Sequence, residues 1–244
     1  MRSWLLKFLI TIATICLVLF ITHRFIQDQS ANQSIEEQKD DNTKAWLTIH
    51  RHKREYGRSD KWLKELWLLV DVTKIDLSFC SIKDNDFINM SKFTELETLI
   101  LCVNKINGSG LKHLKSKKLR VLNLESTDFN DEEAHNLELF PKLEELWLSS
   151  TQISDIGLSH IEESNNLKKL ALAWNNITDN GLVHFEKLDN LKFLHLCKTK
   201  ISDGGLVHLK NLKKLEYLNI ENTNVTKKGV SILQAYLPNC KVVF

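Results

Sequence analysis

The sequence has no C-x-x-C pair, no glycine-rich phosphate loop and no marked excess of charge of either sign. Structural zinc sites need closely spaced cysteine or histidine pairs, so no metal site is expected. The glycines recur singly, and no phosphate-binding motif surrounds them. The formal net charge is only +2, from 33 Lys and Arg against 31 Asp and Glu, which leaves no electrostatic footprint for nucleic acid. These absences argue against zinc proteins, nucleotide-binding proteins and nucleic-acid-binding proteins.

What the sequence does contain is a repeat with a step of 24 residues. Its form is L-x-x-L-x-L/I-x-x-[NT]-x-[IV]-[ST]-x-x-G-[LV]-x-x-[LIF], and one copy is a residue shorter. Copies begin at Val72, Leu96, Leu119, Leu143, Leu167, Leu191 and Leu215. A step and pattern of this kind are typical of leucine-rich repeats.

The chemistry of the repeat can be followed in the copy that begins at Leu167. Leu170 and Leu172 alternate with a smaller residue, the period of a strand with one buried face. Asn175 then closes the strand, where its amide can satisfy backbone groups of the turn. Thr178 and Asp179 suit the start of a short helix, because their oxygens can accept free backbone amides. One such coil cannot bury its leucines alone, so stacking of the coils must supply the core.

The predicted fold is therefore an α/β, right-handed leucine-rich-repeat solenoid. About seven repeats of 23–24 residues cover 72–238, with a parallel concave sheet and short convex helices. A solenoid exposes the leucines of its end repeats, so residues 45–71 are expected to form an N-terminal capping region. Residues 239–244 follow a proline that stops the last helix, and they can add a C-terminal cap strand.

Residues 1–26 differ from the repeats. Arg2 and Lys7 precede an uncharged run over 8–22, which is short for a spanning helix unless flanking apolar residues are counted. No small-x-small cleavage site follows Phe20. An uncleaved signal anchor, a single transmembrane helix with the repeats on the exported side, is therefore predicted, and a cleaved signal peptide with a secreted product is the alternative. Residues 27–44 are polar and aperiodic, and they are expected to form a tether.

The repeated I-[ST]-D-x-G-L at 153–158, 177–182 and 201–206 resembles the cysteine-containing, ribonuclease-inhibitor-like group of leucine-rich repeats. That group includes the substrate-receptor arms of F-box proteins, and similar repeats occur in short exported or membrane-anchored bacterial proteins of planctomycete type. The ending Leu-Pro-Asn-Cys-Lys-Val resembles the close of those bacterial proteins. The resemblance implies recognition of a protein or peptide, mostly on the concave strand face. Residues 45–70 are too short for an F-box.

Candidate binding residues follow from the strand period. The leucines of L-x-x-L-x-L point inward, so the third and fifth positions face the concave surface. With strands about 4.8 Å apart, the aromatic residues at these positions, and those just past the strands, fall within roughly 15 Å. Exposed aromatic side chains are typical of binding hot spots, although aromatic rings can also pack on each other merely to cover a sheet. The predicted contact residues are Trp147, Lys169, Trp174, Phe193, His195 and Tyr217.

Other residues of reactive types carry less information. His113, His160, His184 and His208 occupy equivalent positions, and such side chains form a row, whereas a metal needs ligands that converge on one point. Cysteines 80 and 102 lie at neighbouring strand ends; a disulfide between them is conceivable in an exported domain, but small buried thiols are favoured.

The repeats use nearly the whole chain and leave no separate catalytic domain, so neither an enzyme nor a cofactor nor a small-molecule substrate is expected. A membrane-anchored, non-enzymatic module that binds a protein or peptide is the predicted function. The alternatives are an envelope structural or assembly protein and a soluble intracellular receptor arm or scaffold of F-box type.

Overall fold

The computed structural model describes residues 72–244. The predicted membrane anchor (1–26), tether (27–44) and N-terminal capping region (45–71) lie outside the described residues. No helix within residues 72–244 is long and apolar enough to cross a membrane.

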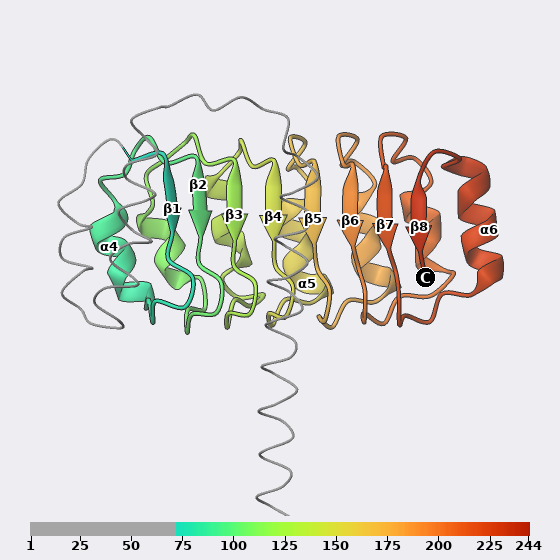
Figure 1. Ribbon diagram of the computed structural model, residues 1–244, viewed down its shortest axis with the longest axis horizontal. Coiled ribbons are helices and arrows are strands. Elements are labelled where there is room, and N and C mark those ends of the chain that lie inside the picture. The colour runs from blue at the N-terminus through green and yellow to red at the C-terminus, as the bar shows by residue number, and fades with distance from the viewer. Residues whose placement is uncertain (1–71) are drawn as a thin grey trace, which may run out of the picture. The chain divides into compact units, whose positions relative to one another are not determined.

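The described residues form one eight-stranded parallel sheet in which the strands follow chain order, with the helices lying behind it (Figure 1). The predicted solenoid is thus confirmed, with an eighth strand after the seven repeats. The strands are β1 (Lys74–Asp76), β2 (Thr98–Ile100), β3 (Val121–Asn123), β4 (Glu145–Trp147), β5 (Lys169–Ala171), β6 (Phe193–His195), β7 (Tyr217–Asn219) and β8 (Lys241–Val243).

The helices behind the sheet are short, and most are 3-10 turns. The α-helices are α4 (Phe87–Met90), α5 (Asp155–Leu158) and α6 (Lys227–Tyr236). The 3-10 helices are η1 (Asp84–Asp86), η2 (Ser109–His113), η3 (Ala134–Leu139), η4 (Ser159–Ile161), η5 (Asp179–Phe185) and η6 (Gly205–Leu209). Each of these helices has three to seven residues, apart from the ten-residue α6 in the last repeat. Thr178 caps η5 by accepting from the Asn180 amide, as the sequence predicted.

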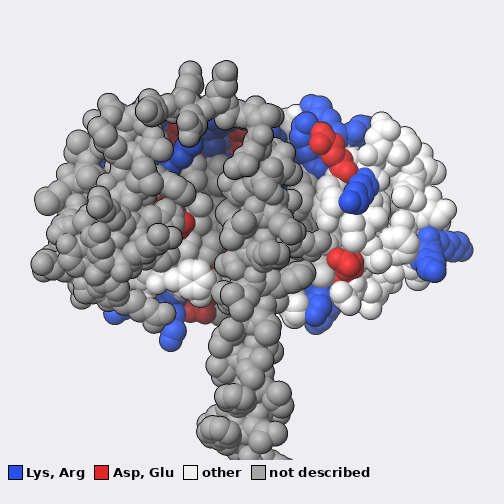
Figure 2. Space-filling view, in the orientation of Figure 1, with Lys and Arg blue, Asp and Glu red and all other residues white. Residues whose placement is uncertain are grey.

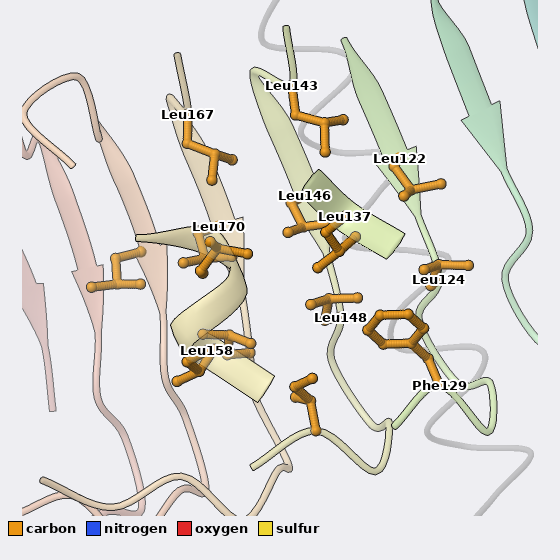
Figure 3. Packing of buried hydrophobic residues seen from close by; sticks show 14 of the residues in the cluster. Leu122, Leu124, Phe129, Leu137, Leu143, Leu146, Leu148, Leu158, Leu167 and Leu170 are labelled. Carbon is orange, nitrogen blue, oxygen red and sulfur yellow. The ribbon is translucent and has the colours of Figure 1, made fainter. Parts of the chain in front are cut away.

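One continuous core fills the space between sheet and helices. The register pairs equivalent leucines on neighbouring strands, so that Leu146 lies beside Leu170 and Leu170 beside Leu194. These leucines are fully buried, and Figure 3 shows Leu146 and Leu170 directed into the same layer as Leu158 from α5. Each repeat thereby supplies one slice of a core that none could form alone.

Two of the turns after the strands are held by an asparagine side chain that bonds the backbone of two repeats, while threonines such as Thr127 and Thr199 bond the backbone of their own repeat at the equivalent place. The Asn175 amide donates to the carbonyl oxygens of Leu148, one repeat earlier, and Leu172, at 2.7 and 3.1 Å. Its side-chain oxygen accepts from the Thr151 amide at 3.0 Å. Asn104 makes the equivalent bonds between the first two repeats: its side-chain amide donates to the Leu77 and Leu101 carbonyl oxygens, and its side-chain oxygen accepts from the Ile82 amide. The predicted role of Asn175 is confirmed, and it extends across the boundary between repeats.

A row of aspartates joins the helix starts of successive repeats. The Asp179 carboxylate accepts from the backbone amide and the hydroxyl of Ser202 in the next repeat, at 2.7 and 2.5 Å. Asp155 and Asp203 make the equivalent bonds to Thr178 and Thr226. The sequence predicted that the aspartate would accept amides of its own helix, and this assignment was wrong: the threonine or serine caps the helix, and the aspartate bridges to the next repeat.

The repeated glycines leave room for these carboxylates. A Cβ built at Gly181 would lie 2.4 Å from the Asp155 Oδ1, and one at Gly205 would lie 2.5 Å from the Asp179 Oδ1. These glycines therefore serve packing, because a side chain there would displace the aspartate that bonds the next repeat.

The cysteines of the described residues are free thiols. Cys80 and Cys102 do not form the conceivable disulfide. Burial, with a smaller contribution from the charge of Glu125, raises the pKa of Cys102 to about 12, and burial raises that of Cys240 to about 11. A thiol with so high a pKa is a poor nucleophile at neutral pH.

A ladder of ion pairs runs along the amino-terminal ends of the strands. The Glu144 carboxylate bonds Arg120 of the preceding repeat at 2.9 Å and Lys168 of the following repeat at 2.7 Å. These two cations lower the pKa of Glu144 to about 2. Further along, Lys192 pairs with Glu216 at 2.8 Å.

The adjacent glycines 204 and 205 provide a test of the aspartate row. Gly205→Ala should lower the free energy of unfolding by about 2 kcal/mol, because its Cβ would overlap the Asp179 carboxylate and the Leu182 side chain. Gly204→Ala is the milder comparison: this glycine is exposed and its backbone is already helical, but a Cβ there would lie 3.0 Å from the Asp179 Oδ2, so the carboxylate must shift by a few tenths of an ångström and the loss should be smaller, about 0.5 kcal/mol. Urea unfolding followed by circular dichroism measures both. Equal losses in the two variants would contradict the packing role of Gly205.

The ion-pair ladder predicts a pH dependence of stability. Because folding lowers the pKa of Glu144, its contribution is fully present above about pH 4.5 and is lost as the pH falls toward 2. Glu144→Gln should therefore reduce the stability lost between pH 6 and pH 3 by about 1 kcal/mol, a value discounted for solvent screening. Glu163→Gln is the control, since the Glu163 side chain is 70% exposed beside Lys187. Unfolding midpoints that shift equally with pH in wild type and Glu144→Gln would refute the assignment.

Candidate functional site

The strand face of the sheet carries the predicted contact residues. Trp147, Lys169, Phe193, His195 and Tyr217 lie at third and fifth positions of strands β4 to β7, and all five are half-buried. Trp174 follows β5 and is exposed, with 45% of its surface accessible. The leucines between these positions are buried in the core. The alternation predicted from the strand period therefore holds at the third positions of β4 to β7 and at the fifth positions of β4 and β6, whereas Ala171 and Asn219 at the fifth positions of β5 and β7 are buried.

Three rings from three strands form an aromatic patch, defined here as Trp147, Phe193 and Tyr217. The Phe193 and Tyr217 rings are parallel, with an interplanar angle of 4° and centroids 5.0 Å apart. The Trp147 ring is tilted by 41° to the Phe193 ring, and their centroids are 5.9 Å apart. The His195 and Phe193 rings pack edge to face, with centroids 6.3 Å apart. The rings thus support one another, and Phe193 is the centre of the patch.

The patch spans β5 at the position of Ala171, the small residue of that strand on this face. Trp147 and Phe193 belong to strands two apart, about 10 Å from each other. Their rings meet at 5.9 Å by leaning across β5, where Ala171 is only 1% exposed. A larger residue at Ala171 would occupy the space between them.

Trp174 forms a second, separate element at the carboxyl end of β5. The Lys198 ammonium lies over its ring, 3.7 Å from the centroid. Both residues adopt the left-handed backbone conformation, with φ of 62° and 57°. A bulky side chain pays a steric cost in this conformation, so the turn fixes the indole at an otherwise unfavourable place. The sequence analysis singled out Trp174 but did not predict its contact with Lys198.

Lys169 is not a free cation on this face. Its ammonium pairs with the Glu145 carboxylate on the neighbouring strand at 3.1 Å. Asn219, the register partner of His195 on β7, is buried and donates to the Glu221 carboxylate at 3.0 Å.

Figure 2 shows this face toward the C-terminal end of the sheet: it is mostly uncharged, with charged side chains gathered near its upper border.

The histidines at equivalent positions of successive repeats form a row and make the same kind of contact in each repeat. His160, His184 and His208 each contact a glutamate of the preceding repeat, at 2.6, 3.0 and 2.6 Å. Among residues 72–244 no group of His, Cys, Asp or Glu side chains is placed to hold a metal ion. The row lies on the helices, opposite the strand face.

Sequence reasoning missed a half-buried carboxyl on the strand face. Glu125 follows β3, and burial raises its pKa, while the hydrogen bond from the Asn123 side-chain amide lowers it in part. The backbone amide of Glu125 donates to the Asn123 side-chain oxygen at 2.9 Å. Asn219 and Glu221 repeat the same arrangement after β7. The shared spacing N-x-E at 123–125 and 219–221 was the signal available in the sequence.

The comparisons with known proteins agree with this architecture. A family model described as Leucine Rich repeat matches residues 163–185. No curated protein matches the chain. Among solved structures, internalin C2 of Listeria monocytogenes is similar with a TM-score of 0.59 and 25% identity, over 70% of this chain and 70% of that chain.

Two further solved structures share the fold at lower identity. A leucine-rich-repeat protein of Leptospira interrogans has a TM-score of 0.53 and 19% identity over 74% of this chain. The ectodomain of the Arabidopsis receptor kinase HAESA, solved with a peptide hormone ligand, has a TM-score of 0.56 and 19% identity over 73% of this chain. The similar region spans 51% of the Leptospira chain and 30% of the HAESA chain. Residues 72–244 therefore form a leucine-rich-repeat domain, structurally similar to the bacterial internalins.

Proposed function

We propose that this domain is a non-enzymatic binding module that holds a protein segment or peptide on its strand face. The aromatic patch of Trp147, Phe193 and Tyr217, together with Trp174, is the contact surface. The observation that carries the proposal is the placement of these rings on an open face, at positions the core does not need. The leucines beneath them already fill the space between sheet and helices.

The composition of the face supports a protein ligand. Large rigid rings bury much surface at a small cost in conformational entropy, which is why Trp and Tyr are enriched at binding hot spots. Lys169 and Glu145 neutralise each other, so the patch presents an apolar centre with a polar border. The leucine-rich-repeat fold usually serves binding, and HAESA holds its peptide hormone with a domain of this fold.

The ring geometry favours ligand side chains that pack beside the rings over flat ligands that stack on them. Phe193 and Tyr217 face each other, so their inner faces are occupied, and Phe193 is further enclosed by Trp147 and His195. A flat ligand that needs a free aromatic face finds little access to Phe193. Apolar side chains of an extended peptide can pack against the ring edges and the outer face of Tyr217.

The proposal includes a membrane anchor formed by residues 1–26, with the repeats on the exported side. It is supported by the uncharged run at 8–22 and by the polar residues 27–44, which are long enough to separate the anchor from the repeats. The alternative is a secreted domain released by signal cleavage.

Substitution in the patch tests the binding face. The double variant Trp147→Ala, Phe193→Ala should weaken partner capture by at least about tenfold, because two hot-spot rings are lost while the core is unchanged. Ile156→Ala is the matched control, since Ile156 is a 72% exposed apolar residue on α5, on the helix side. Pulldown with wild-type and variant protein, quantified after confirming equal thermal stability, gives the comparison. An unchanged set of partners in the double variant would rule out the patch as the contact surface.

Cell fractionation tests the anchor. The full-length chain with separate N-terminal and C-terminal tags should stay in the membrane after carbonate extraction, because an apolar helix is not removed by high pH. External protease should degrade the C-terminal tag and spare the N-terminal one. Loss of the N-terminal tag from a secreted product would instead establish signal cleavage, and a chain that washes off intact and stays inside the cell would refute the anchor.

A further inference from the structure

The lysines near the aromatic patch differ in the groups that their ammonium ions contact. Lys168, just before β5, Lys169 on β5 and Lys192, just before β6, each pair with a glutamate, at 2.7, 3.1 and 2.8 Å. Lys198, after β6, lies over the Trp174 ring. It is exposed, and no ion pair joins its ammonium to a carboxylate of the described residues. Lys241 on β8, the register partner of Tyr217, is likewise exposed and outside any ion pair within residues 72–244, so what distinguishes Lys198 is its contact with the Trp174 ring.

The carboxylate nearest to Lys198 by register belongs to Glu221, and it is used elsewhere. The backbone amide of Lys198 donates to the Glu221 carbonyl oxygen at 2.9 Å, so the two residues are neighbours. The Glu221 side chain accepts from the buried Asn219 amide at 3.0 Å. Lys198 turns to the opposite side, toward Trp174. The indole holds the aliphatic stem and positions the ammonium, while its donors remain open to an incoming acceptor.

From this arrangement we infer that the partner is an acidic peptide segment, and that Trp174 and Lys198 bind its Asp or Glu side chain while the aromatic patch binds an apolar side chain. The inference rests on the proposed function and specifies its ligand. An anion is favoured over a cation at this place because the Lys198 charge repels a second cation from the indole face. The carboxylate gains a charge-assisted hydrogen bond, and its apolar stem gains the exposed indole.

The fold also sets the spacing between the two elements. Phe193 and Lys198 lie at the two ends of β6 and its following turn, and the four extended steps from residue 193 to 197 span roughly 13 Å. An extended peptide covers that distance with about four residues. The acidic residue should therefore lie three to five residues from the apolar anchor in the ligand sequence.

A random peptide library tests the inference without a known partner. Twelve-residue peptides displayed on phage are selected against the full-length protein in mild detergent and, in parallel, against Lys198→Glu and Lys200→Glu. Lys200 is the matched control: it is exposed two residues further along the same turn and carries the same charge. Selected peptides are then synthesised, and their affinities are measured at low and high salt.

Wild type and Lys200→Glu should enrich peptides that combine Asp or Glu with an aromatic or aliphatic residue three to five positions away. Lys198→Glu should bind these peptides about tenfold more weakly and lose the acidic preference, while still selecting apolar residues. Apolar peptides without an acidic preference in wild type, or equal losses in the two lysine variants, would overturn the inference and leave the proposed function intact. Selection that is unchanged by Trp147→Ala, Phe193→Ala would overturn both.

Discussion

The structure depends on one constraint: each repeat must present its strand in the same register as its neighbours. A parallel strand of three residues can offer only a few hydrogen bonds, and the leucines of a single coil have nothing of their own to pack against. The side-chain bridges at Asn175, in the turn after the strand, and at Asp179, at the start of the helix, hold adjacent repeats in that register, because each bonds backbone groups of a neighbouring repeat. A slip of one residue would break both bridges and turn the leucines outward.

The same constraint explains what the sequence could predict. Any residue that repeats with the period has a structural role in every copy, so the fold, the strand positions, the role of Asn175 and the packing role of the glycines could all be predicted. The shorter repeat that begins at Leu96 shows how a departure is absorbed. There Ser116 takes the place of an apolar residue and donates to the Leu96 carbonyl oxygen, so the core loses one side chain and keeps its backbone satisfied.

Interactions between neighbouring repeats could not be predicted in the same way. The aspartate after the helix cap has oxygens that suit its own helix, and only the spacing of adjacent coils shows that the next repeat lies within reach. The contact between Trp174 and Lys198 depends on rotamers and on a left-handed turn that no residue type announces, since none of the repeat turns places glycine there. The pairing of Lys169 with Glu145 likewise follows from the register, which the sequence supplies, and from side-chain directions, which it does not.

Function in this fold resides in the positions that the repeat leaves free. The third and fifth strand positions and the turn that follows have no required side chain, so a ligand site can change there without cost to the core. The left-handed turn that carries Trp174 recurs in every repeat, with residues as different as Ser126, Ser150 and Val103 at the equivalent place, so this backbone conformation belongs to the fold. The Trp174 ring itself is exposed, with a lysine over one face, and it contributes nothing to the core beneath it. Its side chain is therefore available for contact with a partner, which is why the proposed binding surface includes this end of the strands.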